Sequence, residues 1–135
     1  MAPASSNGAV GGEPWAPGGG WWVASGAILL GTLVQATGAG FLVFGGGPLF
    51  HPTFGYVVAL ALLLQLGIVV GSTARRGLAI PATAAFVLSV LAPITALSSA
   101  QIGVPIKSLH PLVGVLIVVA QYEVTRRTVR RWRGS

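Results

Sequence analysis

Cysteine is absent from the 135 residues, and acidic residues number only two. The absence of cysteine excludes disulfides, thiolate metal sites, iron–sulfur ligation and cysteine nucleophiles. The two acids, Glu13 and Glu123, lie near opposite ends of the chain, so no pair of neighbouring carboxylates is available for acid–base catalysis. We therefore assign no catalytic residue. The sequence favours a binding or structural role and leaves enzymatic activity open.

Charged residues are also scarce, at 7% of the chain against 53% hydrophobic residues, and the mean hydropathy is +0.81. A soluble domain of this size needs more polar surface, so the composition predicts a membrane protein. The net charge of +6 comes largely from five arginines within the last ten residues. Because these arginines directly follow an apolar stretch, we expect them to contact the anionic headgroups of a lipid bilayer and not nucleic acid.

Four apolar stretches occupy about residues 21–44, 51–72, 78–98 and 109–125. Each is long enough, at about 1.5 Å per helical residue, to cross a hydrocarbon core of about 30 Å. The pattern predicts an all-α, integral membrane four-helix bundle, with a disordered Gly/Pro/Ala-rich tail at residues 1–20 and a basic tail at residues 126–135. Arg75, Arg76 and the C-terminal arginines fall on the same side of the membrane, so the positive-inside rule places both termini in the cytoplasm. The expected location is the plasma (inner) membrane of a bacterium.

The only two histidines each open the pattern HPxxG, at residues 51–55 and 110–114. The copies are 59 residues apart, the length of two spans with their loops, which predicts two tandem helix-pair repeats. An even number of spans separates the two histidines. We therefore expect both of them at the same side of the membrane, near the outer surface.

The HPxxG pattern supports two interpretations. Proline suits the first turn of a helix, so in the simpler one each histidine only caps a buried helix, near the N-cap position. In the other, the glycine lies one turn deeper on the same face and leaves space beside the histidine for a flat ligand. Two facing copies would then hold a haem iron between His51 and His110, with Gly55 and Gly114 beside the macrocycle and Lys107 near its propionates. A bare zinc or copper ion fits less well, because two neutral nitrogens leave its coordination shell incomplete.

Three other polar residues in the apolar stretches have expected partners. Gln121 lies about 20° around its helix from His110, and Gln65 about 40° from His51, so both face inward. We expect these two glutamines to hydrogen-bond between helices. Glu123 is expected to pair with Arg126 or Arg127 at helical spacing.

A four-span unit with one histidine at the start of the second span and another at the start of the fourth resembles one half of a protein of the haem A synthase family. The resemblance covers about residues 21–125. The resemblance implies that His51 and His110 are axial haem ligands. It does not extend to haem hydroxylation: the chain has a single half, has no acidic residue at the place before His51 where the family has its functional glutamate, and lacks the loop cysteines of many members. Small four-span bacterial membrane proteins with the same histidine pattern are similar as well.

Two functions from different classes remain. The first is a small membrane cytochrome that binds one b-type haem and serves electron transfer, haem handling or redox sensing. The second is a cofactor-free structural or accessory subunit whose glycine-rich helices pack against a larger membrane complex or a second copy. A transporter or channel is disfavoured, because charged residues are absent from the interiors of the spans.

Overall fold

The computed structural model describes residues 18–43, 50–102 and 109–134, and all regular secondary structure among them is helical. Four helices follow one another: α1 (Trp21–Val43), α2 (Phe50–Val70), α3 (Arg75–Ile102) and α4 (Leu109–Arg133). The prediction of an all-α chain with four helices is confirmed. Most of the tail expected at residues 1–20, and also Lys107, lie outside the described residues.

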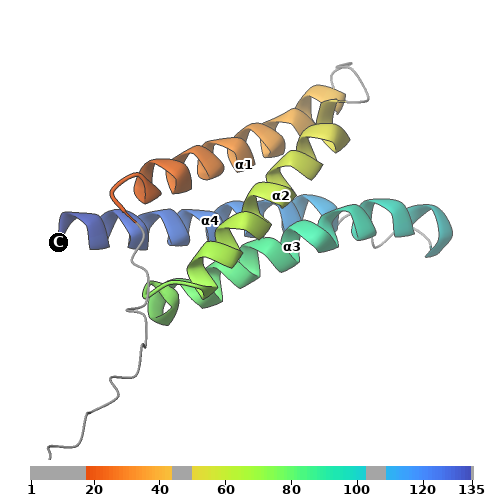
Figure 1. The fold of residues 1–135 in the computed structure, drawn as a ribbon. Coiled ribbons are helices and arrows are strands. Elements are labelled where there is room, and N and C mark those ends of the chain that lie inside the picture. Colours follow the sequence, from red (N-terminus) through yellow and green to blue (C-terminus); the bar gives the residue numbers. More distant parts are fainter. Residues whose placement is uncertain (1–17, 44–49, 103–108, 135) are drawn as a thin grey trace, which may run out of the picture.

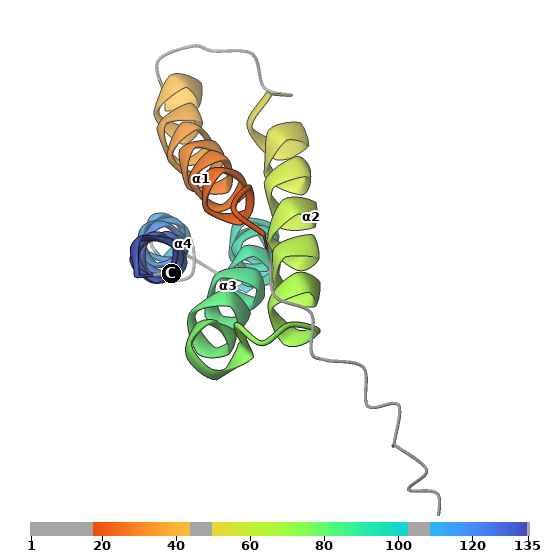
Figure 2. The same cartoon turned by 60° about the vertical axis from the view of Figure 1, so that its left-hand side comes forward.

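The helices run alternately up and down, so α2 and α4 begin at the same end of the bundle (Figure 1). Each helix packs against its neighbours in the sequence, and α1 closes the bundle against α4. Helices α2 and α4 therefore lie on one diagonal, with α1 and α3 between them (Figure 2). Both histidines belong to the diagonal helices.

Large apolar side chains cover the outside of the bundle, while small and polar side chains fill much of its interior. Ile80 is 85% exposed, and exposed large apolar side chains occur on all four helices. Such a surface is unfavourable in water and favourable in lipid, where small and polar residues provide close packing between helices. Two of the described helical segments, Phe50–Val70 and Arg75–Ala96, are long and apolar enough to cross a membrane. The buried polar residues are Ser25, Thr32, Gln65, Ser72, Ser89, Gln121 and Thr128.

A polar layer joins α2 to α4 across the diagonal. Nε2 of Gln65 donates to Oε1 of Gln121 at 2.8 Å, and Nε2 of Gln121 donates to Oε1 of Gln65 at 3.0 Å. Nε2 of Gln121 also donates to the carbonyl oxygen of Ser25 on α1, 3.2 Å away, and the hydroxyl oxygens of Ser25 and Thr125 lie 3.0 Å apart. The predicted hydrogen bonds between the two glutamines are confirmed. Each nitrogen and oxygen of this amide pair has at least one partner.

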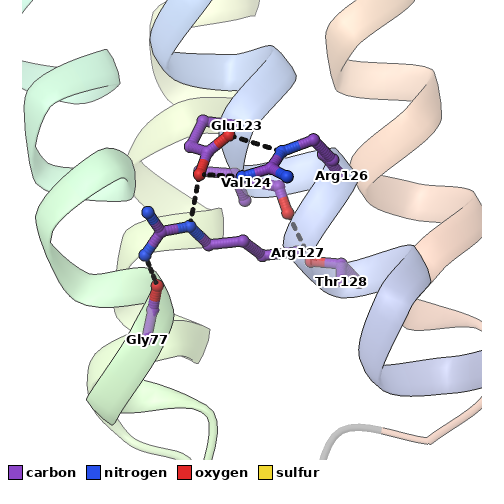
Figure 3. A network of polar contacts seen from close by, with 6 residues as sticks. All are labelled: Gly77, Glu123, Val124, Arg126, Arg127 and Thr128. Atoms are coloured by element: carbon purple, nitrogen blue, oxygen red, sulfur yellow. Dashed lines mark hydrogen bonds and ion pairs between the residues drawn. The ribbon is translucent and has the colours of Figure 1, made fainter. Parts of the chain in front are cut away.

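Helix α4 continues eight residues past Thr125, through the segment expected to be a basic tail. The carboxylate of Glu123 accepts hydrogen bonds from Arg126 and Arg127 at 2.6–2.7 Å, as the helical spacing predicted (Figure 3). Arg127 also donates to the carbonyl oxygen of Gly77 at the start of α3, 2.7 Å away. The bond to Glu123 raises the pKa of Arg126 above its ordinary value. These contacts continue α4 as a helix beyond its apolar part.

Candidate functional site

The two histidines lie close together at one end of the bundle. Each is the second residue of its helix, two residues past the N-cap position expected for it, and Pro52 or Pro111 follows it. A proline in the first turn removes an N–H that has no intrahelical partner in any helix. The centres of the two imidazole rings are 6.1 Å apart, and the ring planes meet at 81°. The histidine pair predicted from HPxxG therefore converges in space.

His110 is oriented by helix α3. Its Nδ1 lies 2.8 Å from the carbonyl oxygen of Ala92 and 3.3 Å from the hydroxyl oxygen of Thr95. A carbonyl oxygen only accepts hydrogen bonds, so the proton of neutral His110 belongs on Nδ1. The lone pair of Nε2 is then available to a metal, as in metal-binding histidines whose other nitrogen donates to a carbonyl group.

His51 is held by helix α1 through Gln35. Nε2 of Gln35 donates to the carbonyl oxygen of His51 at 2.8 Å and lies 3.1 Å from Nδ1 of the same residue. An amide nitrogen only donates, so Nδ1 of His51 accepts and the proton of the neutral ring lies on Nε2. Oε1 of Gln35 is buried and has no hydrogen-bond partner among the described residues. Turning this amide over would place Oε1 against the carbonyl oxygen of His51, and two acceptors repel each other, so freeing Nε2 of His51 for a metal requires the Gln35 side chain to move away.

The glycines of the two HPxxG copies differ in their surroundings. A Cβ atom added to Gly114 would meet no atom within 4 Å, whereas one added to Gly55 would lie 2.8 Å from Nε2 of Gln35. The expected space is thus open on the α4 side and filled by an amide on the α2 side. On α1, a Cβ atom added to Gly38 would lie 3.4 Å from the ring of Phe50 and 3.9 Å from Nδ1 of His51. Gly38 therefore allows the start of α2 to approach α1 closely.

The distance between the imidazoles suits one metal ion between them. With metal–nitrogen distances of about 2.0 Å and ring centres about 1.1 Å behind each nitrogen, imidazoles on opposite sides of an ion have centres roughly 6 Å apart. The described residues contain no group of three or more His, Cys, Asp or Glu side chains that could hold a metal. An ion held by this pair would take its other ligands from outside the described residues, and a haem macrocycle supplies four of them. The surroundings of Gly114 and His110 leave space for a haem, whereas beside Gly55 the Gln35 side chain occupies that space and would have to move away.

Gln35 and Thr95 contact the histidines but were not identified from the sequence. Each lies on the preceding helix, 16 residues before His51 and 15 residues before His110, respectively. In both helix pairs a polar side chain of the preceding helix contacts Nδ1 of the histidine, although Nδ1 accepts in His51 and donates in His110. The sequence contained one signal for this contact: Gln35 is a polar amide in an otherwise apolar stretch. Such residues in a membrane bundle usually contact another helix.

Comparison with known proteins gives no match: no family model, no curated protein and no solved structure resembles this chain.

Proposed function

We propose that the chain is a four-span membrane protein with both termini in the cytoplasm and the histidine pair near the outer surface of a bacterial inner membrane. The apolar outer surface and the two helices of sufficient length and hydropathy support the membrane assignment. The orientation in the membrane follows from the positions of the positive charges. All seven arginines lie either in the first turn of α3 or in the last part of α4, so these helix ends are placed on the cytoplasmic side. Those two helix ends lie together (Figure 1).

We further propose that His51 and His110 bind one b-type haem. The single observation that carries this proposal is the 6.1 Å separation of the imidazole centres on diagonally opposed helices. The Nδ1–H of His110, donated to Ala92, supports it by directing the Nε2 lone pair to the ligand. A bound haem iron supplies one-electron chemistry, which suits electron transfer, haem handling or redox sensing.

The protein residues have separate roles in this proposal. Ala92 and Thr95 fix the ring of His110, and the Gln35 amide selects which nitrogen of His51 is free. Gly114 leaves room for the edge of a planar ligand. Glu123, the one carboxylate side chain among the described residues, lies at the arginine end of the bundle, which favours binding and redox chemistry over acid–base catalysis at the histidine pair.

An absorbance spectrum tests the haem proposal. Protein from haem-replete cells, purified in mild detergent, is expected to show reduced-minus-oxidised Soret and α bands. The double variant His51→Ala, His110→Ala is expected to lose both bands. Thr95→Val, which removes the hydroxyl beside Nδ1 of His110, should weaken haem binding by about 10-fold, because it removes a group that orients a metal ligand. Thr53→Ala, an exposed change in the same turn as His51, is the matched control and should keep the full signal.

A second candidate function, a cofactor-free accessory subunit, is favoured by a different observation. Gln35 already fills the space beside Gly55 and hydrogen-bonds His51, so this side of the site is packed without a ligand. On this proposal the histidines join helices, and the apolar outer surface packs against a larger membrane complex or a second copy. Colourless protein that co-purifies with a stoichiometric partner would support it. Bands that persist in the double-histidine variant would contradict the haem site.

A further inference from the structure

The end of the bundle opposite the histidines contains a cavity of about 230 Å3 with one buried, unpaired donor. This half-open cavity lies between the first turn of α1, the turn that leads into α3, the start of α3 and the last turns of α4. Its volume is smaller than the roughly 300–1,000 Å3 of most small-molecule pockets, so it has room for a headgroup and not for a whole lipid. The residues that line it are Gly18, Gly19, Trp21, Trp22, Thr73, Ala74, Leu78, Thr128, Arg131 and Trp132.

Trp21 supplies the unpaired donor. The ring of Trp21 packs against the apolar cluster around Val69, Leu78 and Val124, and its indole Nε1 is buried without a hydrogen-bond partner among the described residues. A buried N–H without an acceptor costs about 1–3 kcal/mol, and native proteins rarely leave one unpaired. No acceptor for this N–H lies among the described residues.

Arg131 supplies a positive charge to the same cavity. The guanidinium lies against the start of α3, where a Cβ atom added to Gly77 would be 2.6 Å from its Nη2. The only carboxylate among the described residues is Glu123, which already binds Arg126 and Arg127. Arg131 thus forms no ion pair within this part of the chain. An acceptor that carries a negative charge would satisfy both Trp21 and Arg131.

Aromatic rings flank the cavity. The rings of Trp22 on α1 and Trp132 on α4 have centres 5.0 Å apart and planes tilted by 31°. Tryptophan is enriched at the level of lipid headgroups, where its ring is apolar and its N–H is polar. Basic pockets between membrane helices on the cytoplasmic side are typical binding sites for anionic lipid headgroups.

We propose that this cavity binds the phosphate group of an anionic lipid headgroup. The Arg131 guanidinium donates to phosphate oxygens, a turn of the Trp21 ring brings its buried indole N–H to the same oxygens, and the acyl chains lie along the exposed apolar side chains outside. The site rests on the membrane orientation proposed above, which places the arginine end at the cytoplasmic leaflet, where anionic lipids concentrate. It does not depend on haem.

Lipid retention measured by native mass spectrometry tests this site. Protein in a neutral detergent is mixed with equimolar phosphatidylglycerol and phosphatidylcholine, and the bound lipids are counted. One phosphatidylglycerol molecule is expected to be retained in preference to phosphatidylcholine. Arg131→Gln should weaken its retention by about tenfold, which is the loss of one charge-assisted hydrogen bond. Trp21→Phe, which keeps an aromatic ring but removes the N–H, should also weaken the retention of phosphatidylglycerol.

Two further variants separate a built site from diffuse attraction. Gly77→Ala keeps every charge but displaces the Arg131 guanidinium, so it should also weaken retention. Arg133→Gln removes an equal charge outside the cavity lining and should change retention by less than about twofold. Equal losses in Arg131→Gln and Arg133→Gln, with full retention in Trp21→Phe and Gly77→Ala, would overturn the proposal. Inorganic phosphate that binds as tightly as the lipid would also overturn it.

The outcomes separate this site from the proposed function. Colourless protein that still retains phosphatidylglycerol leaves the lipid site in place while the haem proposal fails. Protein that stays soluble without detergent and retains no lipid contradicts the membrane assignment, and the lipid site with it.

Discussion

Glutamine amides have two different roles inside this bundle. Gln65 and Gln121 are almost completely buried and pair with each other through both amide groups, so their desolvation is offset. Gln35 also hydrogen-bonds across helices, but its Oε1 has no partner among the described residues. The inward direction of Gln65 and Gln121 was predictable from helical spacing. The role of Gln35 was not, because spacing along one helix does not show what lies on its neighbour.

The glutamine pair permits a double-mutant cycle. Gln65→Leu or Gln121→Leu alone leaves a buried amide without its partner and should destabilise the bundle by about 1–2 kcal/mol. The double variant should lose less than the sum of the single losses, because two leucines leave no unpaired polar group. Unfolding in mixed detergent micelles, followed by circular dichroism, measures the coupling. Strictly additive losses would show that the two amides contribute independently of each other.

At the level of whole helices, the sequence predicted where each one starts better than where it ends. The HPxxG pattern marks the start of α2 and α4 to within one residue, since proline is suited to the first helical turn. Helices α3 and α4 both extend beyond their predicted ends, because hydropathy identifies only the apolar part of a helix. Helix α4 continues because Glu123 pairs with arginines one turn later, and arginine has a high helix propensity.

The contact between α1 and α2 depends on Gly38. Gly38→Leu should push away Phe50 and His51, destabilise the bundle by about 1–3 kcal/mol and reduce haem occupancy. Gly26→Leu is the matched control on the same helix, because a Cβ atom added there meets nothing within 4 Å. Thermal unfolding and the Soret absorbance measure the two effects. Equal behaviour of the two variants would show that the close approach of α2 to Gly38 is unimportant.

For the molecule as a whole, composition and the spacing of apolar stretches were sufficient to predict four helices. The same reasoning placed both histidines at one end. It could not provide the distance between them, because that distance depends on how two diagonal helices are positioned by the helices between them. The Gln35 amide beside Gly55 was likewise not predictable, since it comes from a third helix.

The orientation in the membrane can be measured without removing native cysteines, because the chain has none. Leu109→Cys at the histidine end should react with a membrane-impermeant maleimide in intact cells. Gly134→Cys at the arginine end should react only after the cells are permeabilised. Both residues are exposed, so accessibility within the folded protein does not limit the reaction. The reverse labelling pattern would place the histidines on the cytoplasmic side.

Helices α2 and α4 meet at two levels, through amides near the middle and through imidazoles at one end, about 16 Å apart along α4. The amide contact consists of protein alone, so the two halves of the newly synthesised chain do not need a prosthetic group to come together. On the haem proposal, membrane insertion and helix assembly would precede haem loading, which would be the last step of biogenesis. Under haem starvation, the cell would accumulate an inserted and folded apoprotein that is ready to be loaded, instead of an incomplete chain marked for degradation.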